Sequence, residues 1–560
     1  MRKNKQKYLR FLIIALSVLA SLKMIFFAVG LDEEYQIVMS YRNAAGDRLF
    51  AEMLEPHQAS AFLCSLLMRP YLQLFGTTGI VLYLRVCGTL LHLGISIYLY
   101  KVLGRMVPGG YAWTLAVLYY NIIPKQIITP EFGMMQVWFY TLCSLFLIQY
   151  YKGPRKVRYL AAAALALVFN VLSYPSCLIL YPFMLYFLFR FSGKNKWRDM
   201  GVVTAVCAFC AAAYLGMLFS YTTPAELFGT LSEIVDSDVT HTLTPGNKLW
   251  FFVYKGLYET VLWIVCFAVS AAVGRWKKLE KEKVFCLTVL PACAIQLVYW
   301  LVLKKGYEAM HIHLIAVTVA GLACCGRTGK KQEDGIPDAA LLRWGIWGAV
   351  LSLLAVVYLT DISLTESIPH AMPAAIYAAA LLVMMPQNGK GQNYAPWVNA
   401  ALTVLLFTAI FGKGFLFRAG YYNNILQSGG IMKEGPAWGT ISDYMGAYIY
   451  NCDYEDWQAY LQDGDRVLIM VDQVGNLGTM QYLFKDVEIS HYSVVNPTGY
   501  GEKLLEYWEE YPGKSPNVII VDCWYGQLMA PPDGWMMNYI ENDFGYTQVI
   551  DGRYIRIYRR

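Results

Sequence analysis

Apolar runs long enough to cross a lipid bilayer recur along the first three quarters of this 560-residue chain, and they constrain its fold more than any other feature. A bilayer has no water to satisfy backbone N–H and C=O groups, so such runs cross it as α-helices. Hydrophobic residues make up 57% of the chain and charged residues only 15%, fewer charges than the surface of a soluble protein carries. The sequence therefore predicts a polytopic α-helical membrane protein with about thirteen transmembrane helices. The predicted spans centre on residues 11–30, 79–100, 111–127, 132–151, 158–171, 174–191, 200–220, 249–273, 284–303, 309–325, 341–359, 372–386 and 396–417.

Lys and Arg are distributed unevenly between the loops. Twenty-five of them lie before the first span or after an even-numbered span, and seven lie in the alternate loops. Because cytoplasmic loops carry the excess of Lys and Arg, we expect the N-terminus in the cytoplasm and the odd-numbered loops outside. An odd number of spans then places the C-terminal region outside as well. The first span follows a basic segment, but its long apolar stretch and the lack of a small-residue cleavage site favour an uncleaved helix.

The C-terminal region has a different character. Residues 437–560 hold 8 basic and 18 acidic residues, whereas the preceding part holds 38 basic and 22 acidic ones. VLIMVD (467–472) and NVIIVD (517–522) are β-branched runs typical of buried parallel strands. We therefore expect residues 1–419 to form the transmembrane body and residues 420–560 an extracytoplasmic α/β accessory domain. Helices are predicted over 454–461, 500–511 and 535–543, shorter strands over 487–491, 546–550 and 554–558, and Cys452 and Cys523 are candidates for a disulfide.

The first outer loop is long and opens with three adjacent carboxylates, Asp32, Glu33 and Glu34, directly after a span. Like charges and lost hydration at the membrane surface raise the pKa of at least one of them unless a cation, a metal or a reaction uses it. The alternative is an ordinary acidic helix start that faces water. Basic charges of the membrane part fall between apolar segments, so a nucleic-acid partner is not expected.

The order of motifs along the chain resembles that of the membrane glycosyltransferases of the GT-C class, and in particular the protein O-mannosyltransferase and aminoarabinose transferase group. The segments that carry this order are DEEYQ (32–36), EPHQ (55–58) and LFG (74–76) in the first loop and LR (84–85) in the span that follows it. Further similar segments are TPEFGMMQ (129–136), ALALVFNVLSYPS (164–176) and KKGYEAMHIH (304–313). The resemblance covers about residues 10–325. At EPHQ the family has a different, Pro-rich step, so this chain departs from the pattern there.

This resemblance implies an inverting glycosyltransferase that takes a sugar from a polyprenyl-phosphate donor on the outer face of the cell membrane. Asp32 corresponds to the family's presumed general base, with Glu33 and Glu131 as further catalytic candidates. A first-turn acid that complements a helix dipole is the alternative for Glu131. The acceptor stays open between a protein, a glycolipid and a cell-wall polymer. No cofactor is expected, and a divalent metal held by outer acids and histidines is the less favoured alternative.

The departing lipid phosphate needs cations, and the predicted outer loops hold few of them. Lys304 and Lys305 lie at a helix exit and are predicted to clamp the phosphate, with snorkelling to lipid headgroups as the alternative. Arg85 lies inside a span and is a predicted substrate-binding residue, with pairing to a loop acid as the alternative. The other predicted substrate-binding residues are His57, Arg69, Tyr307, His311 and His313, and Lys125 is a further candidate for the clamp.

Two functions of other classes compete with this prediction. One is a transporter or flippase for a lipid-linked saccharide, and the other is a non-catalytic protein of cell-envelope polymer assembly. The spans carry almost no buried acids of the kind that ion coupling uses, and the chain shows no duplicated halves. Both observations favour the enzyme.

Overall fold

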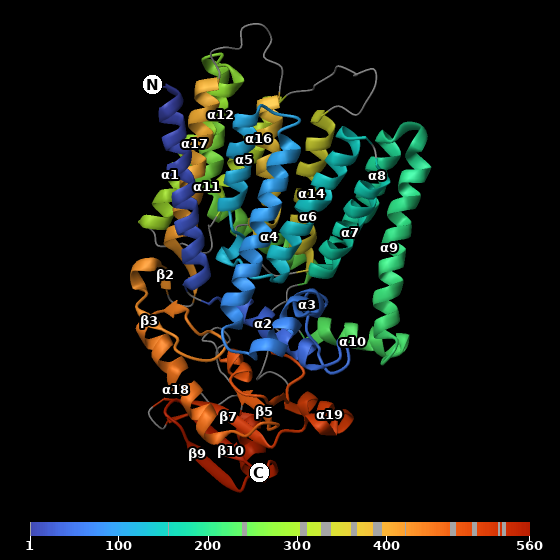
Figure 1. Ribbon diagram of the computed structural model, residues 1–560, viewed down its shortest axis with the longest axis vertical. Coiled ribbons are helices and arrows are strands. Elements are labelled where there is room, and N and C mark those ends of the chain that lie inside the picture. Colours follow the sequence, from blue (N-terminus) through green and yellow to red (C-terminus); the bar gives the residue numbers. More distant parts are fainter. Residues whose placement is uncertain are drawn as a thin grey trace.

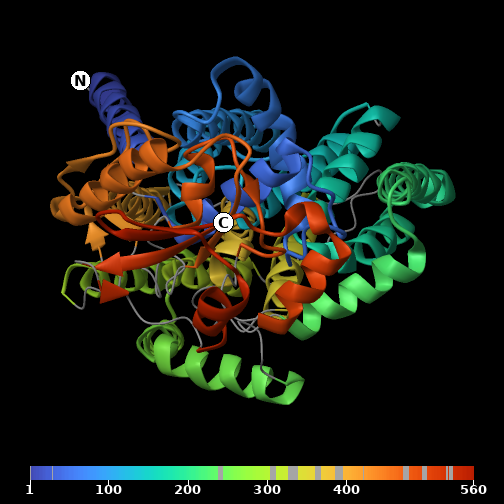
Figure 2. The ribbon, with the colours of Figure 1, turned by 90° about the horizontal axis from the view of Figure 1, so that it is seen from below.

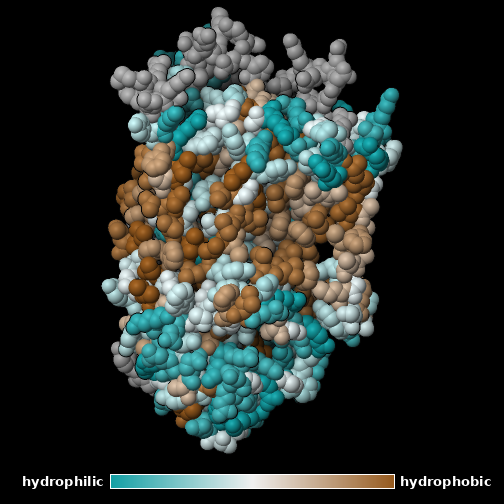
Figure 3. Space-filling view, viewed as in Figure 1, coloured by the Kyte–Doolittle hydropathy of each residue, from teal (hydrophilic) through white to brown (hydrophobic). Residues whose placement is uncertain are grey.

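The computed structural model is a bundle of α-helices with a small α/β domain at one end (Figure 1). The N-terminus lies at the opposite end of the bundle from this domain, as an odd number of crossings requires. On the face shown in Figure 3, an apolar band crosses the bundle, and the surface of the C-terminal domain is mostly hydrophilic. The structure describes residues 2–27, 29–154, 156–237, 244–302, 311–325, 338–359, 367–384, 395–419, 422–470, 478–494, 501–524, 527–528 and 534–560.

Each of the thirteen predicted segments falls on a helix of the bundle. Among the described residues, seven helices are long and apolar enough to cross a membrane, or eight if the bent pair 246–258 and 260–276 is one span. Four other apolar helices are shorter, with 10–17 residues. The bundle consists of α1 (Arg2–Phe26), α4 (Ile80–Leu103), α5 (Gly109–Asn121), α6 (Phe132–Lys152), α7 (Val157–Ser173), α8 (Leu180–Phe191), α9 (Lys196–Leu218), α11 (Pro245–Trp276), α12 (Lys281–Leu301), α13 (His313–Cys325), α14 (Asp338–Leu359), α16 (Met372–Met384) and α17 (Ala395–Phe415).

The predicted span 111–127 is too long at its C-terminal end. Helix α5 ends at Asn121, and the next two residues are extended, with φ −97° at Ile122 and −111° at Ile123. Pro124 explains this end, because the proline ring disfavours helical backbone at the residue before it. A single 3-10 turn, η1 (Pro124–Gln126), follows before α6 begins. The sequence therefore returns to the bundle through an irregular segment, residues 122–131.

Three helices lie at the end of the bundle that carries the C-terminal domain: α2 (Leu31–Ala45), α3 (Gln58–Phe75) and α10 (Pro224–Ser237) (Figure 1). We call this end of the bundle the domain face. Seen from below, the C-terminal domain covers the middle of the bundle, while α9 and α10 lie at its periphery (Figure 2). That the domain face is the outer face of the membrane stays a prediction from the loop charges.

The C-terminal domain is built on the sheet that the sequence predicts. Strands β5 (Arg466–Met470) and β7 (Val518–Trp524) are parallel neighbours, with Val467 opposite Val518. The strand order is β6-β5-β7-β10-β9, and β8 (Gln527–Leu528) pairs with β7. Its other elements are β6 (Glu488–Ile489), β9 (Gln548–Asp551), β10 (Ile555–Arg559), α18 (Tyr444–Tyr460), α19 (Gly501–Glu510) and α20 (Gly534–Asn538).

One helix of this domain differs from the sequence prediction, and the structure answers a question about two cysteines that the sequence leaves open. Helix α18 begins ten residues before the predicted start, because the side chain of Asp443 caps it by accepting a hydrogen bond from the backbone N–H of Gly446 at 2.7 Å. Cys452 and Cys523 are both buried and form no disulfide. Two short hairpins connect the bundle to this domain: β1 (Leu416–Ala419) with β2 (Tyr422–Asn424), and β3 (Gly430–Ile431) with β4 (Ile441–Ser442).

Candidate active site

The first turn of α2 carries the three adjacent carboxylates, and each has a different partner. Gly30 at the N-cap is extended, and the acids that follow complement the positive end of the helix. Glu33 is buried and accepts hydrogen bonds from the Arg85 guanidinium, at 2.8 Å from Nε and 2.6 Å from Nη2. Arg85 lies within α4, where an unpaired charge is costly. This bidentate pair therefore fixes α2 to the bundle. Arg85 thus takes the alternative role of pairing with a loop acid, and its position gives no support to the predicted substrate-binding role.

Glu34 faces the other way, toward the C-terminal domain. Its Oε1 accepts hydrogen bonds from the backbone N–H of Thr479 at 2.9 Å, the Thr479 hydroxyl at 2.6 Å and the N–H of Met480 at 3.1 Å. These donors open the 3-10 helix η7 (Thr479–Leu483), which packs on α2. Further contacts tie the same loop to this domain: Asp47 with Lys514 at 2.6 Å, the Tyr507 hydroxyl with the Glu52 carbonyl at 2.9 Å, and the Leu54 N–H with the Tyr492 carbonyl at 2.9 Å.

Asp32 is the carboxylate of this turn that solvent reaches. Its side chain is 18% exposed, against 2% for Glu33, and its Oδ2 lies 2.9 Å from Nζ of Lys125. The sequence predicts that the neighbouring acids make Asp32 a stronger base. The structure differs, because Arg85 neutralises Glu33 and an ammonium in contact with Asp32 stabilises its charged form. Asp32 is therefore an accessible carboxylate whose proton affinity depends on where Lys125 lies.

Lys125 lies in the turn between α5 and α6. Its backbone is left-handed, with φ 55°, and so is that of Gln126, with φ 57°. The left-handed conformation is unfavourable for residues other than glycine. Two such residues in succession persist only because the packing around them stabilises the turn. The ammonium of Lys125 also lies 3.9 Å from Oε2 of Glu131 and 4.2 Å from the centre of the Phe132 ring. It is thus surrounded by two carboxylates and one aromatic face.

Glu131 is the N-cap of α6. Its buried carboxylate accepts hydrogen bonds from the backbone N–H groups of Gly133, at 2.8 Å, and Met134. Burial raises the pKa of Glu131, while Lys125 and these N–H groups partly offset the shift. Glu131 therefore has the role at the helix start that the sequence offered as the alternative. Its carboxylate also lies near the ammonium of Lys125.

Gly133 permits a close approach of several charged groups to the start of α6. A Cβ at this position lies 3.0 Å from Oε1 of Glu131, 3.0 Å from Cε1 of His370 and 3.3 Å from Nζ of Lys125. His370 comes from the 3-10 helix η4 (Ile368–Ala371), far along the chain, and its Nδ1 lies 3.0 Å from Oε1 of Gln136. A glycine here is what lets the imidazole, the carboxylate and the ammonium come together.

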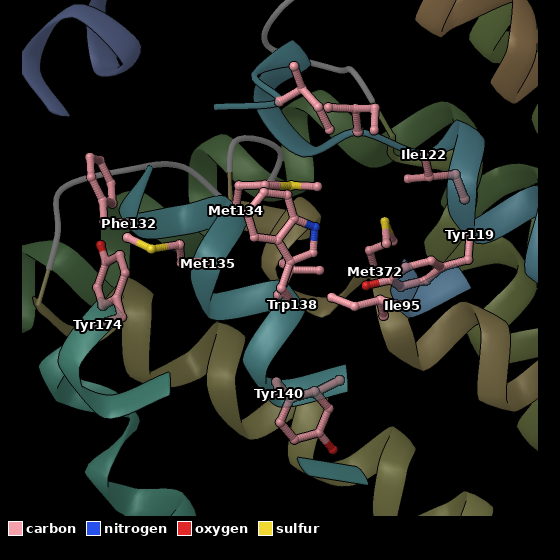
Figure 4. Close-up of a cluster of buried hydrophobic side chains, with 14 of the residues drawn as sticks. Ile95, Tyr119, Ile122, Phe132, Met134, Met135, Trp138, Tyr140, Tyr174 and Met372 are labelled. Atoms are coloured by element: carbon pink, nitrogen blue, oxygen red, sulfur yellow. The ribbon is translucent and has the colours of Figure 1, made fainter. Parts of the chain in front are cut away.

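Aromatic rings form one wall of this cluster. The His57 imidazole stacks on Phe132 with ring centres 3.9 Å apart and an angle of 2° between the planes. Tyr174 lies 5.0 Å from His57 and 5.6 Å from His370, again between ring centres. Phe132 and Tyr174 lie side by side at the edge of the buried cluster drawn in Figure 4. His57 and Tyr174 thus stand between the charged cluster and the space beyond.

That space is a largely apolar cavity of about 810 Å³. It runs between α7 and α9, and at the domain face it is lined by the segment that precedes α3 and by α10. Its polar groups gather at that end, where Glu55, His57 and Lys248 line it. The remaining walls are Phe50, Pro56, Ala59, Leu167, Val168, Val171, Leu172, Tyr174, Pro175, Leu178, Tyr181, Thr204, Cys207, Ala208, Cys210, Ala211, Tyr214, Leu215, Leu231 and Ile234.

The cavity reaches deep into the bundle along α9. The lining residues of this helix extend from Leu215, near its domain-face end, to Thr204, where the Tyr181 hydroxyl lies 2.9 Å from the Thr204 hydroxyl. Eleven residues of helix correspond to about 16 Å at 1.5 Å per residue. Cys207, Ala208 and the other small residues of α9 make this space. A long, narrow, apolar space of this kind fits a hydrocarbon chain better than it fits a free sugar.

Glu55 closes the mouth of the cavity from the domain side. Its buried carboxyl group accepts hydrogen bonds from the Ser493 hydroxyl, at 3.1 Å, and from the N–H of Val494. Burial raises the pKa of Glu55 to about 7, although Arg42 and these donors oppose the shift. The mouth is therefore shared between the first loop and the C-terminal domain.

Several predicted substrate-binding residues lie away from this cluster. Arg69 is exposed on α3, and its Nη2 donates to the backbone carbonyl of Asn43 at 3.1 Å. Asn43 lies eleven residues after Asp32 on α2, which is about 16 Å along the helix axis. The predicted role of Arg69 at the donor phosphate therefore has no support from its position.

His311 and His313 are fully buried behind the turn that holds Lys125. The His311 Nε2 lies 3.3 Å from the Ile123 carbonyl, so it supports the backbone just before that turn. The His313 ring lies 6.0 Å from that of Trp300. Lys304, Lys305 and Tyr307 lie outside the described residues, so the predicted phosphate clamp stays a prediction.

Sequence reasoning did not select three residues that the structure places at the site. His370 and Tyr174 come from distant segments, and no local pattern links them to Asp32. Glu55 belongs to the EPHQ step, where the family pattern is not followed. Lys125 carried the clearest signal, since it is the one cation between residues 111 and 131 and directly follows Pro124.

No three His, Cys, Asp or Glu side chains within the described ranges are grouped so that they could hold a metal ion. Whether the protein needs a metal or another cofactor therefore stays a prediction from the sequence. The candidate site is described by its carboxylates, its ammonium group and its aromatic wall.

Comparison with known proteins gives matches in structure alone. No family model and no curated protein sequence matches the chain. Among solved structures, the oligosaccharyltransferase AglB of Archaeoglobus fulgidus, in complex with an inhibitory peptide and a dolichol-phosphate, has a TM-score of 0.47 and 12% identity over 92% of this chain and 70% of its own. ArnT of Cupriavidus metallidurans, bound to undecaprenyl phosphate, has a TM-score of 0.42 and 11% identity over 98% and 97%. Because the TM-scores lie below 0.5, the argument about function rests on the residues of this chain.

Proposed function

We propose that this protein is an inverting glycosyltransferase that moves a sugar from a polyprenyl-phosphate donor to an acceptor at the domain face. The observation that carries the proposal is the connection between the apolar cavity and the charged cluster. Phe132 makes that connection, because His57 stacks on its ring at 3.9 Å and the ammonium of Lys125 lies 4.2 Å from its centre. A lipid tail in the cavity thus places its polar head within reach of Asp32.

The size and polarity of the cavity support a lipid-linked donor rather than a soluble nucleotide sugar. Its walls on the α9 side are mostly apolar, and its ionisable groups Glu55, His57 and Lys248 gather at the domain face. An isoprenoid tail buried there loses its contact with water or with mobile lipid, while the phosphate and sugar stay at the polar mouth. Binding along the tail fixes the position of the anomeric carbon, which is a large part of what catalysis needs.

Asp32 is the group we propose as the general base. The nucleophilic oxygen or nitrogen of the acceptor bonds to the anomeric carbon, and its proton passes to the Asp32 carboxylate. The bond between that carbon and the phosphate oxygen breaks on the opposite face of the sugar, and its electron pair leaves with the lipid phosphate. The configuration at the anomeric carbon is therefore inverted. Nearby carboxylates also stabilise the positive charge that develops on the sugar ring.

Glu33 and Glu131 are proposed to act through other residues and not on the substrate. Each carboxylate is buried, with Glu33 held by Arg85 and Glu131 by the backbone at the start of α6. We propose that Glu33 positions Asp32 and that Glu131 positions Lys125. Neither is proposed to touch the sugar.

Sugar transfer by an Asp32→Asn variant tests the proposal. Purified protein is supplied with a panel of radiolabelled polyprenyl-phosphate sugars and with membranes that contain candidate acceptors, and labelled product is measured. Wild-type protein is expected to transfer label, and the variant to lose at least about a hundredfold of the rate, as for removal of a general base. Arg69→Gln, a change at an exposed cation away from the site, is the matched control and is expected to keep the rate.

The same preparation separates the enzyme from its rivals. If no donor of the panel gives transferred label while the reconstituted protein moves a lipid-linked sugar across vesicles, a flippase replaces the enzyme. If the Asp32→Asn variant folds and transfers label at the wild-type rate, Asp32 is not the base.

A further inference from the structure

The proposed base is paired with a cation, and this arrangement needs an explanation. Asp32 accepts a proton readily only when no ammonium stabilises its charged form. Yet Nζ of Lys125 lies 2.9 Å from its Oδ2, and both side chains are largely shielded from water, with exposed fractions of 11% and 18%. An active base therefore requires that Lys125 leave Asp32 during the reaction.

The surroundings of Lys125 suit a movable cation. Its Nζ is 2.9 Å from one carboxylate, 3.9 Å from Glu131 and 4.2 Å from the Phe132 ring centre, so only Asp32 holds it at hydrogen-bond distance among these three. Its backbone and that of Gln126 are left-handed. Such outliers cluster where a structure must switch or hold a ligand. The side chain itself is a flexible stem that ends in three donors.

Lys125 is also close to where the donor phosphate is proposed to lie. Because the distances of 4.2 Å and 3.9 Å both run to the Phe132 ring centre, the Lys125 ammonium and the His57 ring centre are no more than about 8 Å apart. His57 lines the mouth of the cavity. A phosphate monoester or diester at this mouth offers several charged oxygens, and ammonium–phosphate hydrogen bonds are among the strongest polar contacts in proteins.

We propose that Lys125 is a phosphate-binding residue of the donor site, and that Asp32 and the donor phosphate compete for its ammonium group. Without donor, Lys125 occupies Asp32. When the lipid phosphate arrives, Lys125 turns to it, stabilises the leaving group and frees the carboxylate to accept the proton of the acceptor. The base is thus available only when the donor is bound. This inference rests on the proposed function, since it assigns a residue to the same donor.

Competition has a signature that a merely structural ion pair lacks. Removal of the Asp32 charge releases Lys125, so Asp32→Asn is expected to bind a polyprenyl phosphate about five to ten times more tightly than wild type, which corresponds to the loss of one partly exposed ion pair. Lys125→Gln is expected to bind it about tenfold more weakly, and Lys125→Arg to keep most of the affinity. Asp32 also repels the phosphate directly, so the double variant is needed to separate the two effects.

The test is a double-variant cycle on the full-length protein in detergent. The probe is a fluorescent polyprenyl monophosphate, with the matching polyprenol as the ligand that lacks the phosphate. Asp32→Asn is made in the wild-type and in the Lys125→Gln background, and thermal unfolding confirms that each variant is folded. The inference expects the gain from Asp32→Asn to fall below about twofold when Lys125 is absent. An equal gain in both backgrounds overturns the competition, and unchanged affinity in folded Lys125→Gln overturns the whole assignment.

Failure of this inference differs from failure of the proposed function. Phosphate-dependent binding through Lys125 without any sugar transfer leaves the assignment in place and removes the enzyme. If the wild-type protein transfers sugar but the Lys125→Gln variant binds the phosphate with normal affinity, the enzyme stays in place and the assignment of Lys125 is removed. Equal binding of the phosphate and the polyprenol by wild-type protein contradicts both.

Discussion

Helices α6 and α9 pass the same test of length and apolarity, yet they have opposite places in the bundle. In α6, 83% of the most apolar stretch of membrane-spanning length is buried within the protein. In residues 193–218, which contain α9, the buried share of the corresponding stretch is 11%. Helix α6 carries buried polar side chains, among them Gln136 and Thr141, while α9 presents small residues to the cavity and large apolar ones outward. The cluster of charged side chains lies at the start of the central helix α6, and the proposed lipid lies against the peripheral helix α9.

The largest test of this contrast compares one large side chain from each helix. Trp138 of α6 is fully buried, and its indole N–H donates to Nδ1 of His92 at 2.9 Å. Trp138→Ala leaves a cavity and an unpaired ring nitrogen, so we expect it to lower the free energy of unfolding by about 3–5 kcal/mol. Phe209→Ala on α9, where the side chain is 75% exposed, is expected to change it by less than about 0.5 kcal/mol. Thermal unfolding in detergent measures both, and similar losses contradict the contrast.

The second test uses pH at the mouth of the cavity, which α9 lines and α6 does not. Because burial raises the pKa of Glu55 to about 7 from an ordinary value of 4.5, the folded protein binds its proton more tightly than the unfolded chain does. The resulting stabilisation is fully present below about pH 4.5 and is lost as pH rises through about 7, by up to about 3 kcal/mol. Glu55→Gln is expected to remove this part of the pH dependence. The profile of unfolding free energy against pH measures it, and identical slopes for the two proteins contradict the assignment.

The third test fills the cavity from α9. Ala211 lines it, so Ala211→Trp places a large side chain where the lipid tail is proposed to lie. We expect at least about tenfold weaker binding of a polyprenyl phosphate, with unchanged unfolding. Ala212→Trp is the matched control, because Ala212 is exposed on the same helix and is not a lining residue of this cavity. Equal affinities for the two variants show that the tail lies elsewhere.

The smallest test compares one glycine from each helix. At Gly133 of α6, a Cβ meets Glu131, His370 and Lys125 at 3.0–3.3 Å, whereas at Gly216 of α9 it meets nothing within 4 Å. Gly216→Ala is therefore expected to stabilise the protein by up to about 1 kcal/mol, as for a helical glycine in open space. Gly133→Ala is expected to shift the charged groups by a few tenths of an ångström and to slow sugar transfer several-fold. Unfolding and transfer measurements that show no difference between the two contradict this account.

Much of the fold follows from periodicity and polarity alone. Every predicted membrane segment falls on a helix, and the two β-branched runs of the C-terminal domain are the parallel neighbours β5 and β7. The error at α5 has a local cause that the sequence also contains, since Pro124 forbids the continuation that the apolar composition suggests. Apolar patterning shows where a helix lies, but it does not show how many of its residues the neighbours cover.

The site was less predictable, because it depends on which segments meet. Asp32 stands out in the sequence, directly after a span and beside two other acids. The residues that give each acid a different role do not stand out in the sequence. Arg85 lies 52 residues after Glu33, and Thr479 lies 445 residues after Glu34. His370 joins the cluster only because η4 packs against the start of α6. Roles of single carboxylates therefore required the three-dimensional structure.

The hydrogen bonds of Glu34 also have a consequence for how the protein is made. The ribosome synthesises α2 long before residues 479 and 480, which supply the donors for this carboxylate. Until then the start of α2 holds a carboxylate without its final donors, and the mouth of the cavity lacks one of its sides. The nascent chain thus carries the proposed base from its first helices onward, but it completes the surroundings of that base only when translation reaches the last domain.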